Sequence, residues 1–139
     1  CIFCKKQKVY HMFNKLLPIT IIASSMAFAV PLSAQDLTRA QQNAVRSANS
    51  YLEFSGFSRV GLIYQLSSEY VDDYDVRDAT VAVDSLSVDW NTQAIRSANS
   101  YLAMSGFSCN GLINQLSSEY GDKYTQSQAR YGAQQAGAC

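Results

Sequence analysis

Arg46-Ser-Ala-Asn-Ser-Tyr-Leu52 occurs a second time as Arg96-Ser-Ala-Asn-Ser-Tyr-Leu102, fifty residues further along the chain. Around these segments the whole of Ala44 to Tyr74 aligns without gaps with Ala94 to Tyr124, and 23 of the 31 aligned positions are identical. Repeats of 20 to 50 residues are typical of arrays of supersecondary units, because one such unit cannot bury its apolar face alone. The sequence therefore predicts a small folding unit that is used twice.

Each copy predicts three helices. Apolar residues between Ala44 and Leu52 recur at spacings of three and four, which indicates one buried stripe on a helix. We expect Gly56 to end this helix as a left-handed C-cap, and Ser58 to cap the next helix, about Arg59 to Glu69. The periodicity of Val76 to Leu86 then predicts a third helix and outweighs the β-branched residues within it.

The predicted fold class is therefore all-α, with two tandem three-helix repeats that resemble helix-turn-helix units, at 35–88 and 89–139. Asp89 is expected to cap the first helix of the second repeat. Trp90 follows in that first turn and has no aligned aromatic residue in the first repeat. We expect it to pack between the two repeats rather than to bind a partner.

Residues 1–34 have a different composition, with four lysines followed by an apolar run from Leu16 to Leu32. This pattern predicts a secretory signal peptide. Cleavage is expected between Ala34 and Gln35, and Ala27 to Ala29 offers a second possible site. Residues 1–11 precede Met12 and are either untranslated leader or a longer basic n-region.

Without residues 1–34 the chain has seven basic and eleven acidic residues, a net charge of 7 − 11 = −4. An acidic chain argues against binding to a phosphate backbone, which needs clustered Lys and Arg. The helix-turn-helix pattern of Tyr51 to Glu69 does not alter this interpretation, because Arg59 is the one base in its second helix. We expect no nucleic-acid partner, and contact with the membrane only through an uncleaved signal segment.

Two cysteines, Cys109 and Cys139, follow the predicted signal. In an oxidising compartment they could pair, tying the C-terminal tail to the second repeat. A free or intermolecular thiol is an equal alternative, because Cys109 aligns with Arg59 and the fold does not demand a cysteine there.

The residues that most catalytic and metal sites need are missing after Met12. There is no histidine, no nucleophile elbow, and no phosphate-binding glycine loop. The acids Asp72, Asp73, Asp75 and Asp78 lack the glycine and final glutamate of a calcium loop and are interpreted as a solvated turn. We expect no enzymatic activity, no metal and no cofactor.

A polar side of the first helix of each repeat, together with positions that differ between the copies, is the candidate partner-binding surface. Its residues are Arg46, Asn49, Glu53, Arg59, Tyr64, Arg96, Asn99 and Asn114. Identical exposed residues in two copies indicate two equivalent contacts with a partner, but recent duplication explains them equally well.

Three stretches carry a family resemblance: Ala48-Asn-Ser-Tyr-Leu52, Phe57 to Leu66 with its repeat, and Val88-Asp-Trp-Asn91. In these the chain resembles the Ltp family of host cell surface-exposed lipoproteins from temperate phages and bacteria. The resemblance covers nearly all of the chain after the signal. It implies tandem three-helix repeats and superinfection exclusion, in which a surface protein blocks DNA entry by a second phage, through contact with its tape-measure protein.

The sequence departs from that family at the predicted cleavage site, where Gln35 stands in place of the cysteine that a lipoprotein needs. The resemblance therefore implies an exported, periplasmic or secreted protein, or one held by an uncleaved signal. The alternative function is an envelope or secreted helical binding module with an unrelated ligand.

Overall fold

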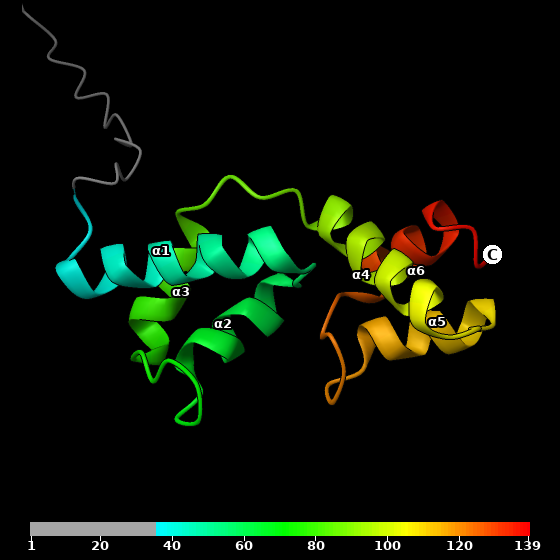
Figure 1. Ribbon diagram of the computed structural model, residues 1–139. Coiled ribbons are helices and arrows are strands. Elements are labelled where there is room, and N and C mark those ends of the chain that lie inside the picture. Colours follow the sequence, from blue (N-terminus) through cyan, green and yellow to red (C-terminus); the bar gives the residue numbers. More distant parts are fainter. Residues whose placement is uncertain (1–35) are drawn as a thin grey trace, which may run out of the picture. The chain divides into compact units, whose positions relative to one another are not determined.

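The structure is a computed structural model, and it describes residues 36–139. The predicted signal peptide and its cleavage site at Ala34 and Gln35 lie outside the described residues. Within the described part, all regular structure is helical (Figure 1). The helices are α1 (Arg39–Phe54), α2 (Arg59–Ser67), α3 (Val76–Asp84), α4 (Trp90–Met104), α5 (Cys109–Ser117) and α6 (Gln126–Gln135).

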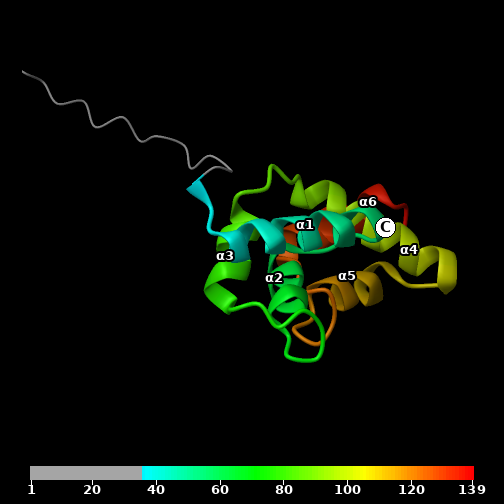
Figure 2. The same ribbon diagram turned by 60° about the vertical axis from the view of Figure 1, so that its left-hand side comes forward.

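Each repeat is a bundle of three helices, which confirms the predicted fold class. In the first repeat α1 packs on α3, with α2 against both, and the two views of the ribbon agree (Figures 1 and 2). In the second repeat α4 packs in the same way on α6, with α5 against both. None of these helices is long and apolar enough to cross a membrane, among the residues that the structure describes.

Side-chain oxygens begin the helices, as the spacing predicts. Ser58 accepts a hydrogen bond from the Gly61 amide at 2.8 Å, and Asp89 accepts one from the Asn91 amide at 3.0 Å. These bonds satisfy amide groups that a helix start leaves without partners. A complete capping box forms at Thr125 with Gln128, whereas Asp75 makes only the simple cap.

The prediction that Gly56 is a left-handed C-cap is wrong, and the glycine is needed for another reason. The helix α1 ends at Phe54, its C-cap Ser55 has an extended backbone, and Gly56 does not adopt a left-handed conformation. A Cβ atom at Gly56 would instead lie 2.6 Å from the carbonyl oxygen of Gln93 and 2.8 Å from the Ser97 amide, both in α4. Glycine is needed here for the close approach of the second repeat.

Buried alanines and leucines form the core of each bundle. In the first repeat Ala48, Leu62 and Leu66 are fully buried, and the matching residues Ala98, Leu112 and Leu116 are fully buried in the second. Burial of apolar surface of this kind is the main stabilising contribution to a small domain.

The single Trp links α4 to the core of the first repeat. Trp90 opens α4 of the second repeat, yet it packs against the core of the first repeat. The expectation that it packs between the repeats is confirmed.

The second repeat is tied at its C-terminus by a disulfide. Cys109 and Cys139, for which the sequence left pairing open, are joined with a Cα–Cα distance of 4.8 Å. Gly137 makes the turn after α6 with a φ of 85°, a conformation that favours glycine. The chain can therefore turn back from α6 and reach the start of α5.

Candidate functional site

The two repeats meet through two unlike surfaces. The first repeat supplies a surface that we name the glycine face: Gly56, Ser58 and Gly61, with the carbonyl groups of Leu52 and Glu53. The second repeat supplies what we name the arginine face: Gln93, Arg96, Ser97, Asp122 and Lys123.

Arg96 closes the contact at one side. Its guanidinium donates to the carbonyl oxygen of Leu52 at 2.6 Å and to that of Glu53 at 3.3 Å. Carbonyl groups in the last turn of a helix have no partner within the helix, and the negative end of the helix dipole favours a cation there. Gln93 holds the same guanidinium through a hydrogen bond of 3.0 Å. Arg96 is therefore a structural link between repeats.

Ser58 closes the contact at the other side. Its hydroxyl donates to the carbonyl oxygen of Asp122 while it accepts from the Gly61 amide. Ser58 is only 1% exposed, so both of its hydrogen-bonding functions are satisfied in a buried position. The same residue therefore begins a helix in one repeat and anchors a turn of the other.

A polar cluster supports that turn from inside the second repeat. The Tyr101 hydroxyl donates to the Asp122 carboxylate at 3.0 Å, and Gln115 donates to the Tyr101 hydroxyl at 3.1 Å. Burial raises the pKa of the Asp122 carboxyl above its usual value, and the hydrogen bond from Tyr101 opposes this shift. Burial also raises the pKa of the Tyr124 hydroxyl, which is 2.9 Å from the hydroxyl of Ser97.

Between the two faces lies an open cleft with a volume of about 710 Å³. Its walls include Phe57 and Tyr64 from the first repeat and Tyr120, Glu119 and Lys123 from the second. The Lys123 ammonium lies 5.2 Å from the centre of the Tyr64 ring, within the range of a cation–π contact. Lys123 has a left-handed backbone at this turn, with a φ of 60°.

The cleft has the composition of a protein-binding surface. Tyr64 is 61% exposed and Tyr120 is fully exposed, so two aromatic residues face solvent in the cleft, beside the half-buried Lys123. Tyr and other aromatic residues are enriched at the centres of protein interfaces, where they bury large areas with few rotatable bonds. No group of three or more possible metal ligands occurs among residues 36–139.

The structure separates the residues of the predicted partner-binding surface. Arg96 is half-buried between the repeats, and Tyr64 lines the cleft. The others lie on the surface outside it, where Arg46 donates to the Asn43 side chain. They are Arg46, Asn49, Glu53, Arg59, Asn99 and Asn114. The aligned arginines Arg46 and Arg96 therefore do not occupy equivalent positions.

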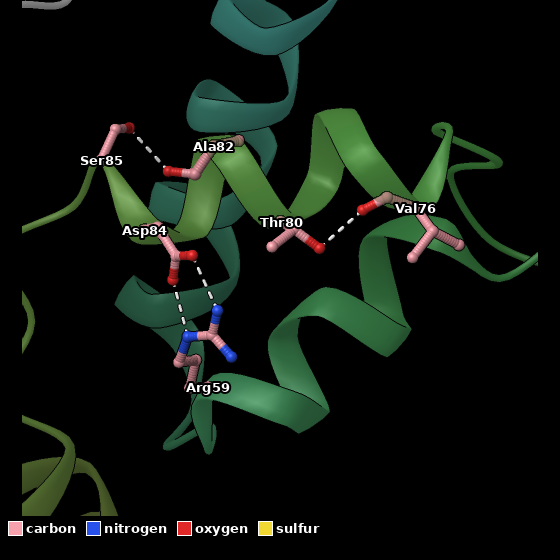
Figure 3. Close-up of polar contacts among 6 residues, drawn as sticks. All are labelled: Arg59, Val76, Thr80, Ala82, Asp84 and Ser85. Atoms are coloured by element: carbon pink, nitrogen blue, oxygen red, sulfur yellow. Dashed lines mark hydrogen bonds and ion pairs between the residues drawn. The ribbon is translucent and has the colours of Figure 1, made fainter. Parts of the chain in front are cut away.

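Arg59 pairs with a residue of its own repeat. Its guanidinium donates two hydrogen bonds to the Asp84 carboxylate, at 2.6 and 2.7 Å (Figure 3). These bonds lower the pKa of Asp84 and raise that of Arg59. The ion pair joins the start of α2 to the end of α3, as the disulfide joins the start of α5 to the tail after α6. The two copies use different chemistry for one structural role.

Sequence reasoning did not assign a role in the site to Ser58, Gly56, Tyr120 or Asp122. The repeat carries Ser, Gly, Tyr and Asp at these positions in both copies, so the sequence gives no sign that one copy is buried or lines a cleft. The usable signal was the difference between Asp73 and Lys123, which marks a turn where the copies diverge.

The fold and the inter-repeat contact define a protein made of two tandem three-helix repeats. The chain belongs to the Ltp family, described as host cell surface-exposed lipoproteins, whose model matches residues 39–86 and 89–135. That description is consistent with export.

Among solved structures, the chain is similar to Ltp, a superinfection exclusion protein from the Streptococcus thermophilus temperate phage TP-J34. The match has 30% sequence identity and a TM-score of 0.63, and covers 70% of this chain and 96% of that one. No curated protein matches the chain.

Proposed function

We propose that this protein excludes superinfecting phages by blocking DNA injection through contact with an incoming phage protein, the tape-measure protein. The observation that carries the proposal is the similarity to a superinfection exclusion protein, nearly all of whose solved chain is matched. Both repeats belong to that family. The activity would be protein binding without catalysis and without a cofactor.

The inter-repeat cleft is the surface that we assign to the partner. It brings Tyr64, Tyr120 and Lys123 together, whereas the exposed candidate residues on α1 and α4 lie outside it. A groove with aromatic walls suits an extended or helical segment of a phage protein that passes through the envelope.

The proposal requires export. The signal pattern of residues 1–34, with cleavage at Ala34 and Gln35, would deliver the chain beyond the inner membrane. We propose a periplasmic or secreted protein without a lipid anchor, or one held by an uncleaved signal.

The test is to express the protein in its host and to measure phage adsorption and DNA injection separately over a representative phage panel. We expect normal adsorption and reduced injection for at least one phage. Normal injection of DNA by every phage would refute a function in superinfection exclusion and would favour an envelope binding module with an unrelated ligand. A chain without residues 12–34 should lose protection, and unchanged protection would point to an intracellular role.

Matched variants test the cleft. Tyr120→Ala removes a fully exposed ring from the cleft, and Tyr70→Ala removes the aligned ring, 88% exposed, which does not line the cleft. Truncation of an interface hot spot costs about 2 kcal/mol or more, so we expect Tyr120→Ala to weaken protection about thirtyfold or more. Tyr70→Ala should protect like the parent. Equal protection by both variants would move the partner-binding surface away from the cleft.

A further inference from the structure

Each repeat carries both halves of the inter-repeat contact, but the chain uses each half only once. The glycine face of the first repeat returns in the second as Gly106, Ser108 and Gly111, with the carbonyl groups of Leu102 and Ala103. The arginine face of the second repeat returns in the first as Asn43, Arg46, Ser47, Asp72 and Asp73. One face of each kind is therefore left over.

Burial follows this division at the serines and the arginine of the two faces. Ser58 is 1% exposed in the contact, whereas the identical Ser108 is exposed. Arg96 and Ser97 are half-buried and buried, whereas Arg46 is exposed and Ser47 is half-buried. The two unused faces thus have the residues of a buried contact, and none of the other residues between 36 and 139 covers them as the contact between the repeats covers Ser58 and Ser97.

Gly106 is the clearest of these residues. Its φ is not in the left-handed region, and no atom of the part of the chain that the structure describes lies within 4 Å of the place where a Cβ would stand. Neither the backbone conformation nor a contact among the described residues therefore requires glycine at position 106. The aligned Gly56 does have a reason, because α4 approaches it within the space of a Cβ atom. A second α-helix seated on Gly106 would supply the same reason.

The unused arginine face is already arranged for such a contact. Arg46 donates to the Asn43 side chain, just as Arg96 donates to Gln93 in the same helix position. The Asp73 backbone has a φ of 52°, close to the 60° of Lys123, so the turn that carries the acceptor carbonyl is preserved. Val71 stands 47% exposed in this turn and would be covered by a partner.

The positions that differ between the copies remain compatible. Within the chain, Tyr64 of one repeat faces Lys123 of the other. In the unused faces the corresponding residues are Asn114 and Asp73, whose amide and carboxylate groups can form a hydrogen bond. The cation–π pair is replaced by another attractive pair, and no like charges are brought together.

We infer that copies of this protein associate head to tail, with the arginine face of the first repeat of one chain on the glycine face of the second repeat of the next. The partner is a second copy because the contact continues one that the chain already makes. Since the two faces are different, the contact is heterologous and can extend to further copies. The inference does not depend on the exclusion function.

The association should be weak. Within the chain, the short link between repeats provides an effective concentration on the order of millimolar, and Trp90 adds a contact that the intermolecular pair lacks. We therefore expect half-association between about 0.1 and 1 mM. Confinement of the protein to the envelope would raise its local concentration.

The test follows the average mass of the purified protein by sedimentation over this concentration range, with amide chemical shifts from NMR. We expect the mass to rise beyond that of two chains, and the amides of Gly106, Ser108, Arg46 and Ser47 to shift with concentration. The amides of Gly56 and Ser58 should stay fixed. A constant mass of one chain, or shifts spread over unrelated surfaces, would overturn the inference.

Two variants make the test specific. Gly106→Arg blocks the unused glycine face in a place where the monomer has open space, and Arg46→Glu removes the donor of the unused arginine face. Each alone should remain monomeric without a loss in melting temperature. Mixed together they should form a complex that stops at two chains, because each retains one intact face. Asn99→Ala lies outside both faces and should associate like the parent.

A mixture that stays monomeric, or variants that still associate, would refute head-to-tail stacking.

Discussion

The same substitution at two aligned glycines should have opposite effects on stability. Gly56→Ala places a Cβ atom 2.6 Å from the Gln93 carbonyl oxygen and the Ser97 hydroxyl, and 2.8 Å from the Ser97 amide. Two of these three atoms belong to the backbone of α4, so relief requires the repeats to move apart. Gly106→Ala places its Cβ more than 4 Å from every other atom counted among the described residues.

The pair isolates one energetic contribution. Replacing glycine by alanine reduces the entropy of the unfolded chain, which stabilises by about 0.4–1 kcal/mol where the backbone permits it. This contribution is nearly equal at the two positions and cancels in their difference. What remains is the overpacking at Gly56, about 1–3 kcal/mol. We therefore expect Gly56→Ala to be less stable than Gly106→Ala by that amount, or about 5–20 °C in melting temperature.

The assay is urea unfolding of both variants in dilute solution, followed by fluorescence of Trp90, which packs across the repeats. Dilution keeps the two unused faces of the chain free. Free energies of unfolding that agree within about 0.5 kcal/mol would refute the reasoning, because surface substitutions vary by that much without specific contacts.

Three further predictions concern single interactions. The double variant Cys109→Ser, Cys139→Ser removes the disulfide and should lower the free energy of unfolding by about 3.6 kcal/mol, from the loop entropy for a sequence separation of 30. A reductant should cause the same loss in the parent and no change in the double variant. Equal stability with and without the bond would contradict this prediction. Asp122→Asn keeps an acceptor for Tyr101 and removes a carboxylate whose pKa is raised by burial. Because the pKa of Asp122 is higher in the folded state, its stabilising contribution in the parent is lost as the pH rises through that pKa. Urea titrations should therefore show the free energy of unfolding of the variant rising relative to that of the parent from about pH 4 upward. A difference between the two proteins that stays constant with pH would argue against this prediction. Arg59→Ala should lower the free energy of unfolding by at most about 1 kcal/mol near pH 7, since the side chains of Arg59 and Asp84 are 43% and 48% exposed. This loss should disappear as the pH falls through the lowered pKa of Asp84. A loss above about 2 kcal/mol would show that the ion pair is better shielded from solvent than its exposure indicates.

The fold was predictable because its local signals agree with one another. The caps at Ser58 and Asp89 and the apolar stripe of the first helix all point to short helices, and the structure forms them. The prediction for Gly56 failed because glycine after a helix has two possible causes. A left-handed cap is a local property, whereas close approach of another helix depends on residues forty positions away.

The candidate site was less predictable, for a related reason. Arg46 and Arg96 are each followed by the same six residues, so no local pattern distinguishes the exposed arginine from the one that links the two repeats. Cys109 and Cys139 were recognisable as possible partners, but their pairing depends on the turn at Gly137 that returns the tail to α5.

The duplicated sequence by itself determined two copies of one three-helix unit, because caps and apolar periodicity act within a few residues. Only the tertiary structure decided which copy of each shared residue is covered. Ser58 is buried and Ser108 is exposed, although both cap a helix in the same way. Burial is a property of the neighbour as much as of the residue, and within residues 36–139 each repeat has a neighbouring repeat on one side.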